Sequence, residues 1–179
     1  MLGVAAGASA TVMVEIPLDT MIRDADVIVH GRVVESGVRM NANGDSFVPE
    51  TLTTVQVTEW LDGEDRGETV TLRELGGIWQ GGGLHYEGTP RYRVGEEVIL
   101  FLERRPEAPN DLRTMGMVQG KFFVRHGVPG VPSSVRRDLE GIAFASWADG
   151  QQHVNAPGDD PAIELDVFLD HVRRVRGAR

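Results

Sequence analysis

The fold of this chain is decided by three stretches of sequence: ADVIVHGRVV at residues 25–34, VGEEVILFL at residues 94–102 and GMVQGKFFV at residues 116–124. Each stretch is rich in β-branched or aromatic residues and contains or adjoins glycine, a composition typical of strands bounded by turns. The whole chain has 22 glycines and 9 prolines, which favours many turns and short strands over a helical bundle. We therefore expect a mainly β fold in which the three stretches are strands of one small barrel.

The first stretch has apolar residues on both faces of the predicted strand. Val27 and Val29 would lie on one face and Ile28 on the other, as in a central strand that is covered on both sides. Gly31 interrupts this apolar run, and a glycine inside a strand predicts a bulge or a sharp bend.

Two further strands and two helices complete the predicted fold. Residues 51–60 and 69–75 alternate between β-branched and polar side chains, as half-buried strands do. Residues 18–25 predict a short helix with Asp19 as N-cap, and Asp160 predicts the N-cap of a C-terminal helix. The apolar positions of this last helix follow helical spacing: Leu165, Phe168, Leu169, Val172 and Val175.

Length and charge narrow the possible functions. A chain of 179 residues suits one domain with one core. The net charge is −9, which argues against binding nucleic acid or an anionic membrane surface, because both ligands need a basic face. The chain has no cysteine, so disulfides, thiolate metal sites and cysteine nucleophiles are all excluded.

The first ten residues bear on where the protein works. Residues 1–10 are small and apolar and end in Ala8, Ser9 and Ala10, a pattern like that of a signal-peptidase cleavage site. They predict either the remnant of a secretory signal peptide, with a mature chain from Thr11 onward, or a disordered leader. No segment approaches the roughly 20 apolar residues of a membrane span. We expect a secreted or periplasmic protein whose single domain covers residues 11–179.

The order of these elements resembles a known group of barrels. A short helix, the ADVIVHGRV strand, GEEVILFL at residues 95–102 and QGKFFV at residues 119–124 are similar to OB-like barrels of the netrin-module and tissue-inhibitor-of-metalloproteinases type. They also resemble secreted bacterial proteins of unassigned function. The resemblance covers residues 18–124 and implies a five- or six-stranded OB-like barrel, here with a short N-terminal and a C-terminal helix. The inhibitors of that group grip zinc through an N-terminal cysteine, which this chain lacks, so the resemblance implies a binding module and leaves its target open.

The glycine-rich residues 76–88 and the segment after them hold the predicted binding residues Trp79, His85, Tyr86 and Tyr92. A long glycine-rich loop in a compact domain is usually functional or mobile. Exposed aromatic rings bury a large area at low entropic cost when they bind a protein or a sugar. The alternative is that Trp79 and Tyr92 turn back and cover one end of the barrel.

Catalytic and metal-binding patterns are weak. The closest to a metal site is His85 with Glu87, whose side chains would share one face of a strand, together with His126. Neither HExxH nor GxSxG occurs, and we expect neither an enzyme nor a cofactor. Small basic spots could meet an anion or an acidic partner, or be ordinary solvated surface: Arg136, Arg137, Arg173, Arg174, Arg176 and Arg179.

Taken together, the residues favour a secreted, non-catalytic binding module, an inhibitor or companion of an extracellular protease. A carbohydrate- or cell-surface-binding module is the first alternative, and a small hydrolase or metal enzyme is the second. Residues 135–149 fit either a strand or a short helix, and the sequence does not decide between them.

Overall fold

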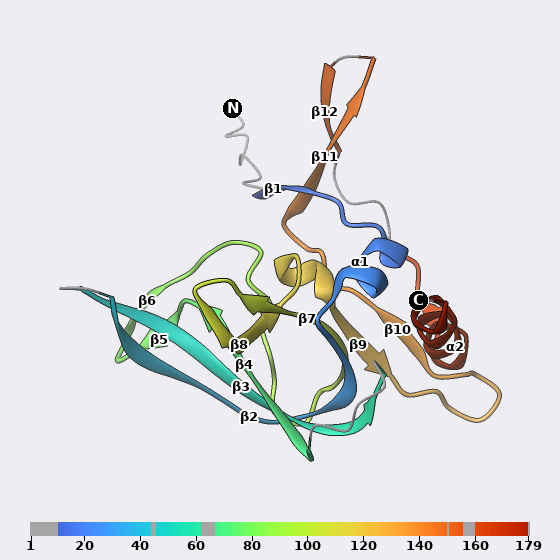
Figure 1. The fold of residues 1–179 in the computed structure, drawn as a ribbon, viewed down its shortest axis with the longest axis horizontal. Coiled ribbons are helices and arrows are strands. Elements are labelled where there is room, and N and C mark those ends of the chain that lie inside the picture. Colours follow the sequence, from blue (N-terminus) through green and yellow to red (C-terminus); the bar gives the residue numbers. More distant parts are fainter. Residues whose placement is uncertain (1–10, 44–45, 62–66, 150, 156–159, 179) are drawn as a thin grey trace, which may run out of the picture.

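The fold is mainly β, with two α-helices (Figure 1). A computed structural model describes residues 11–43, 46–61, 67–149, 151–155 and 160–178. The expected signal-peptide remnant at residues 1–10 lies outside the described residues. None of the described helices is long and apolar enough to cross a membrane.

Most strands belong to one eight-stranded sheet. Its members are β2 (Val27–Asn43), β3 (Ser46–Trp60), β4 (Thr69–Leu75), β7 (Glu97–Arg105), β8 (Ala108–Thr114), β9 (Lys121–Arg125), β10 (Ser134–Arg136) and β13 (Ile163–Glu164). They lie in the order β13-β10-β9-β7-β2-β3-β4-β8, and β7 also pairs with β8. All pairings in this sheet are antiparallel except the short parallel one that joins β4 to β8. The pairings of β2, β3, β4, β8 and β7 thus lead back to β2.

The predicted strands are confirmed with shifted ends. The stretch at residues 25–34 begins β2, which lies between β3 and β7, and the stretch at residues 94–102 supplies most of β7. Residues 69–75 are β4 as expected. The stretch at residues 116–124 is strand only in its second half, because a 3-10 turn, η1 (Met117–Gly120), precedes β9.

Gly31 lies at an irregularity of β2, as the sequence predicted. The register between β2 and β3 shifts between His30 and Gly31. A Cβ atom at Gly31 would lie 2.3 Å from the backbone oxygen of Gln56 on β3, well inside contact distance. Glycine is needed here because the two strands approach more closely at the bulge than any side chain allows.

The two faces of β2 and β7 are buried in different clusters. One face contributes to a cluster enclosed mainly by strands, which we call the strand-side core. Its buried members are Val27, Val29, Val33, Val55, Val70, Leu72, Tyr92, Val98, Leu100 and Leu102. Since Ile28 and Ile99 are buried on the opposite face, β2 and β7 are covered on both sides, as the apolar residues on both faces of β2 predicted.

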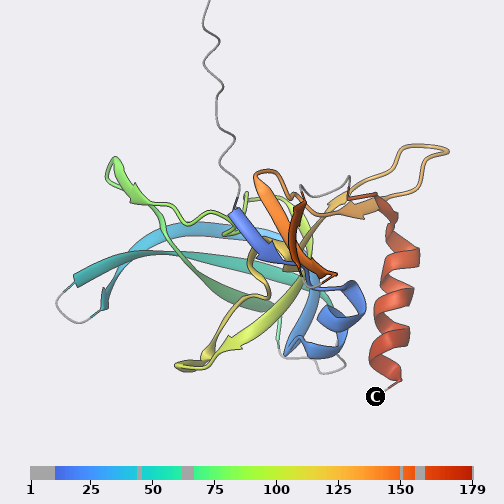
Figure 2. The same cartoon turned by 90° about the horizontal axis from the view of Figure 1, so that it is seen from above.

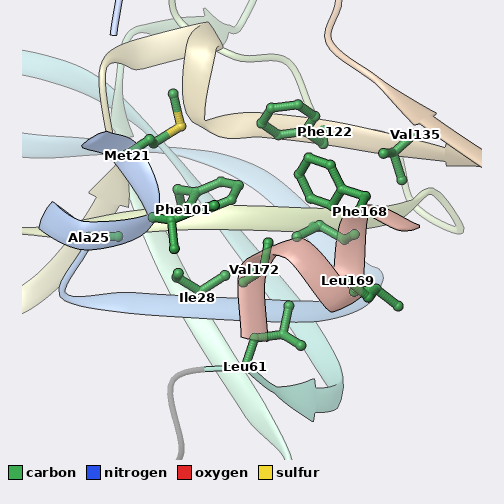
Figure 3. Close-up of a cluster of buried hydrophobic side chains, with 12 residues drawn as sticks. Met21, Ala25, Ile28, Leu61, Phe101, Phe122, Val135, Phe168, Leu169 and Val172 are labelled. Carbon is green, nitrogen blue, oxygen red and sulfur yellow. The ribbon is translucent and has the colours of Figure 1, made fainter. Parts of the chain in front are cut away.

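The opposite face packs against α1 (Leu18–Asp24) and α2 (Leu165–Gly177) and forms the helix-side core (Figure 3). Phe101, Phe122 and Phe168 meet there, with 5.6 Å between the ring centroids of Phe101 and Phe122 and 4.8 Å between those of Phe122 and Phe168. From α2, Phe168, Leu169 and Val172 are buried. The helical spacing read from the sequence therefore identified the buried face of α2 correctly.

Both predicted N-caps are wrong. Helix α1 has Pro17 at its N-cap. Asp19 lies in its first turn, where a carboxylate interacts favourably with the helix dipole. Helix α2 begins at Leu165, after Glu164. Asp160 instead accepts hydrogen bonds from the backbone and the guanidinium of Arg137. Asp160 thus forms an ion pair with a residue distant in sequence instead of capping the nearby helix.

Residues 135–149, for which the sequence left strand and helix open, contain the end of β10 and, from residue 142, a strand of a second, three-stranded sheet. This sheet consists of β1 (Thr11–Val14), β11 (Ile142–Ala148) and β12 (Gln151–Asn155), with β11 between the other two and parallel to β1. Its base packs in a small cluster of Leu139, Ile142 and Phe144. In Figure 2, α2 lies at one end of the molecule, and the long β2–β3 ribbon reaches the other end.

Candidate functional site: a groove and a pocket around the glycine-rich segment

The first part of the glycine-rich segment is a small hairpin rather than the irregular loop the sequence suggested. β5 (Gly77–Trp79) and β6 (Gly82–Leu84) pair antiparallel, and β5 lies beside β2 and β3 (Figure 1). Gly77 has φ 145°, and a Cβ atom there would lie 2.5 Å from Cγ2 of Val38. Glycine therefore lets the hairpin lie close against β2, where any side chain would collide.

The four predicted binding residues fall into two groups. Trp79 and Tyr86 are 42% and 39% exposed, and His85 is exposed beside them. Tyr92 is only 9% exposed and belongs to the strand-side core. The prediction of an exposed ring is thus wrong for Tyr92, and the alternative that this ring turns inward holds for Tyr92 but not for Trp79.

Tyr92 ends a chain of buried hydrogen bonds that the sequence did not suggest. The backbone N–H and the hydroxyl of Thr114 donate to Oε1 of Glu74, at 2.8 and 2.6 Å. The Tyr92 hydroxyl then donates to Oγ1 of Thr114, at 2.5 Å. Burial raises the pKa of Glu74 to about 7, against the opposing effect of the Thr114 hydrogen bonds. Burial also raises the pKa of Tyr92, so its hydroxyl stays protonated and remains a donor.

An apolar groove of about 720 Å³ lies between the hairpin and the ribbon of β2 and β3. Its apolar walls include Val38, Leu75, Ile78 and Leu84, and glycines 76, 77 and 81–83 form much of the remaining surface. Ile78 is 78% exposed, although it is a large apolar residue. Exposed apolar side chains gathered around a concave surface are typical of binding sites.

A more polar pocket of about 620 Å³ adjoins this groove. The two share His85, Thr89 and Arg91. The pocket is lined by the five cationic side chains Arg91, Arg93, Lys121, Arg125 and Arg136, together with four carboxylates, Glu87, Glu96, Asp138 and Glu140. The chain as a whole has 27 carboxylates and only 18 lysines and arginines, so this pocket departs from the acidic character of the protein.

Lys121 fixes the inner wall of the pocket. Its Nζ donates to the backbone oxygen of Arg91 and lies 2.8 Å from Oε2 of Glu96. It also lies 4.8 Å from the centroid of the Tyr92 ring, within the range of a cation–π contact. Burial lowers the pKa of Lys121, and the hydrogen bond to Glu96 partly offsets this. Lys121 therefore joins the residues that follow the glycine-rich segment to β9.

The residues of the weak metal-binding pattern are not brought together. His85 and Glu87 are neighbours, 3.3 Å apart between Nε2 and Oε1. His126, however, pairs with Glu97, which is also bound by His30 and Arg32. Across the described ranges, no three histidine, aspartate or glutamate side chains are grouped in a way that could hold a metal ion.

Arg91, Arg93 and Arg125 were missed as site residues, although the sequence carries a signal for them. Residues 91–93 read Arg-Tyr-Arg and residues 121–125 read Lys-Phe-Phe-Val-Arg. In an extended chain alternate side chains lie on one side, so the arginines and Lys121 face the pocket while Tyr92 and Phe122 are buried. What the sequence could not show is that these two segments lie side by side.

Comparisons with protein-family models, with curated proteins and with solved structures find no match for this chain.

Proposed function

We propose that this protein is a secreted or periplasmic, non-catalytic binding module built on an OB-like barrel. The pairings β2–β3–β4–β8–β7 that lead back to β2, antiparallel apart from β4–β8, support the barrel. The small apolar residues that end in Ala8, Ser9 and Ala10 support export from the cell.

The observation that carries the binding proposal is the apolar groove at the glycine-rich hairpin. Ile78 and Leu84 line the groove, and Trp79 belongs to the same hairpin; all three are exposed. A partner that covered them would remove their apolar surface from water, and this hydrophobic contribution is the dominant favourable term in protein association. A protein partner fits this surface, since an extended segment could lie along the groove. An extracellular protease, inhibited or accompanied by this module, is the partner that the barrel resemblance suggests.

The experiment introduces a charge into the groove. Immobilised wild-type protein and an Ile78→Asp variant are incubated with culture medium of the source organism, and retained proteins are identified by mass spectrometry. Each retained protease is then tested for inhibition and for its Kd. We expect Ile78→Asp to weaken binding at least tenfold, because a carboxylate would be desolvated in the complex.

Val128→Asp is the matched control, because Val128 is 65% exposed and does not line the groove. It should bind like the wild type. Equal retention by wild type and Ile78→Asp would refute the groove as the binding surface.

A carbohydrate ligand is the second candidate, because Trp79 and Tyr86 are both partly exposed beside the groove. Aromatic faces at the surface can stack on sugar rings. A glycan array would show specific signals that Trp79→Ala abolishes. Signals that Trp79→Ala leaves unchanged would argue against this candidate.

A further inference from the structure

The polar pocket presents arginines whose charge is not neutralised by neighbouring carboxylates. Arg93, Arg125 and Arg136 form no ion pair with any carboxylate of the described residues, and the Arg91 guanidinium lies 3.4 Å from Nε2 of His85. Arg136 lies over the Phe123 ring, 5.1 Å from its centroid, which holds its guanidinium in place without neutralising it.

The carboxylates of the pocket offset only part of its positive charge. Glu96 is bound by Lys121, and Glu87 lies 3.3 Å from Nε2 of His85, the same nitrogen that Arg91 contacts. Glu87, Asp138 and Glu140 remain, against four guanidinium groups. Positive charge therefore exceeds negative charge in a concave part of the surface, where walls of low dielectric concentrate the field.

The shape of the guanidinium group selects the ligand further. Arginine forms paired, parallel hydrogen bonds with planar carboxylates, and it is less strongly hydrated than lysine. The pocket also adjoins the apolar groove, since His85, Thr89 and Arg91 line both. A ligand that crosses this boundary meets apolar walls at one end and arginines at the other.

We infer that the polar pocket binds the carboxylates of an acidic polypeptide segment whose apolar residues lie in the adjoining groove. This inference rests on the proposed function as a protein-binding module and specifies the chemistry of the partner. The pocket carboxylates would repel the acidic side chains of the ligand, which would therefore be held by the guanidinium groups of Arg91, Arg93, Arg125 and Arg136.

The test uses two labelled peptides with blocked ends, one of three leucines, a glycine and three aspartates, and one in which asparagines replace the aspartates. Binding to the full chain is measured by fluorescence anisotropy. We expect the aspartate peptide to bind at least tenfold more tightly than the asparagine peptide. Its affinity should fall as the salt concentration is raised, because salt screens exposed charges. Arg125→Gln combined with Arg136→Gln should bring its affinity close to that of the asparagine peptide.

Arg173→Gln is the matched control, because Arg173 is a partly exposed arginine that pairs with Glu59 away from the pocket. Arg93→Gln is a second pocket variant, which avoids the contact of Arg136 with Phe123. Circular dichroism establishes that each variant is folded.

Two results would overturn the inference. Equal affinity of the two peptides would show that the arginines do not select carboxylates. A second overturning result has two parts: the aspartate peptide binds as tightly when serines replace its leucines, and millimolar inorganic phosphate displaces it. This result would show a simple anion site to which the apolar groove contributes nothing. Failure of the proposed function looks different, since Ile78→Asp would then leave the affinity of both peptides unchanged.

Discussion

The two cores on either side of β2 and β7 are built from different chemistry. The helix-side core has Phe101, Phe122 and Phe168 at its centre, and the guanidinium of Arg137 lies against the Phe122 ring. The strand-side core is lined by valines and leucines but also takes in Tyr92, next to the buried Thr114 and Glu74. The first core depends mainly on buried apolar contact area, whereas the second depends also on a protonation state.

This difference matters for the candidate site, because the polar chain lies directly behind it. Tyr92 is flanked in sequence by the pocket residues Arg91 and Arg93, and its ring is contacted by Lys121. The hydrogen bond to Thr114 therefore anchors the segment that carries the arginines. A buried polar network that is fully hydrogen-bonded fixes one arrangement of the groups around it.

The largest effect is expected in the helix-side core. Phe168→Ala should lower the free energy of unfolding by about 3–5 kcal/mol, since it removes a buried ring and leaves a cavity. Denaturant unfolding followed by circular dichroism measures this. Val167→Ala, at an exposed position of α2, is the control and should change the free energy of unfolding by less than about 0.5 kcal/mol. Similar losses in both variants would mean that α2 is not fixed by this core.

The second effect depends on pH. The pKa of Glu74 is about 7 in the folded protein, above its ordinary value of 4.5. The folded state therefore holds this proton more tightly, so its stabilising effect is complete below pH 4.5 and is lost as pH rises through 7. The loss amounts to about 3 kcal/mol at most, from roughly 1.4 kcal/mol per pKa unit.

Glu74→Gln isolates this effect, because glutamine has the shape of the protonated acid and does not titrate. The difference in unfolding free energy between wild type and variant should shift in favour of the variant between pH 4.5 and pH 7. Taking the difference removes the contributions of the other carboxylates. A difference that stays constant over this range would show that folding does not raise the pKa of Glu74.

The smallest effect is expected at the end of the polar chain. Tyr92→Phe removes the hydroxyl that donates to Thr114 and keeps the ring. It should cost about 1 kcal/mol, the usual net contribution of one hydrogen bond. Affinity for the aspartate peptide should also fall, while affinity for the asparagine peptide should not. A variant as stable as the wild type would mean that the polar chain adds nothing to this core.

Local patterns in the sequence predicted the main elements. The alternation within residues 69–75 predicted β4, and the spacing of Phe168, Leu169 and Val172 predicted the buried face of α2. The start of α2 was predicted wrongly, because Asp160 pairs with Arg137 instead of capping the helix. A contact between distant residues replaced a local one, and no local pattern can reveal that.

By itself, the sequence determined the strands β2, β3, β4 and β7, the two helices and the position of the glycine-rich segment. These follow from the period of the apolar residues and from the conformational freedom of glycine, which act over a few neighbouring residues. Only the tertiary structure decided that Tyr92 is buried against Thr114, and that Arg91 and Arg93 lie beside Arg125 and Arg136. The physical reason is that burial and charge clustering depend on the pairing of segments far apart in the chain.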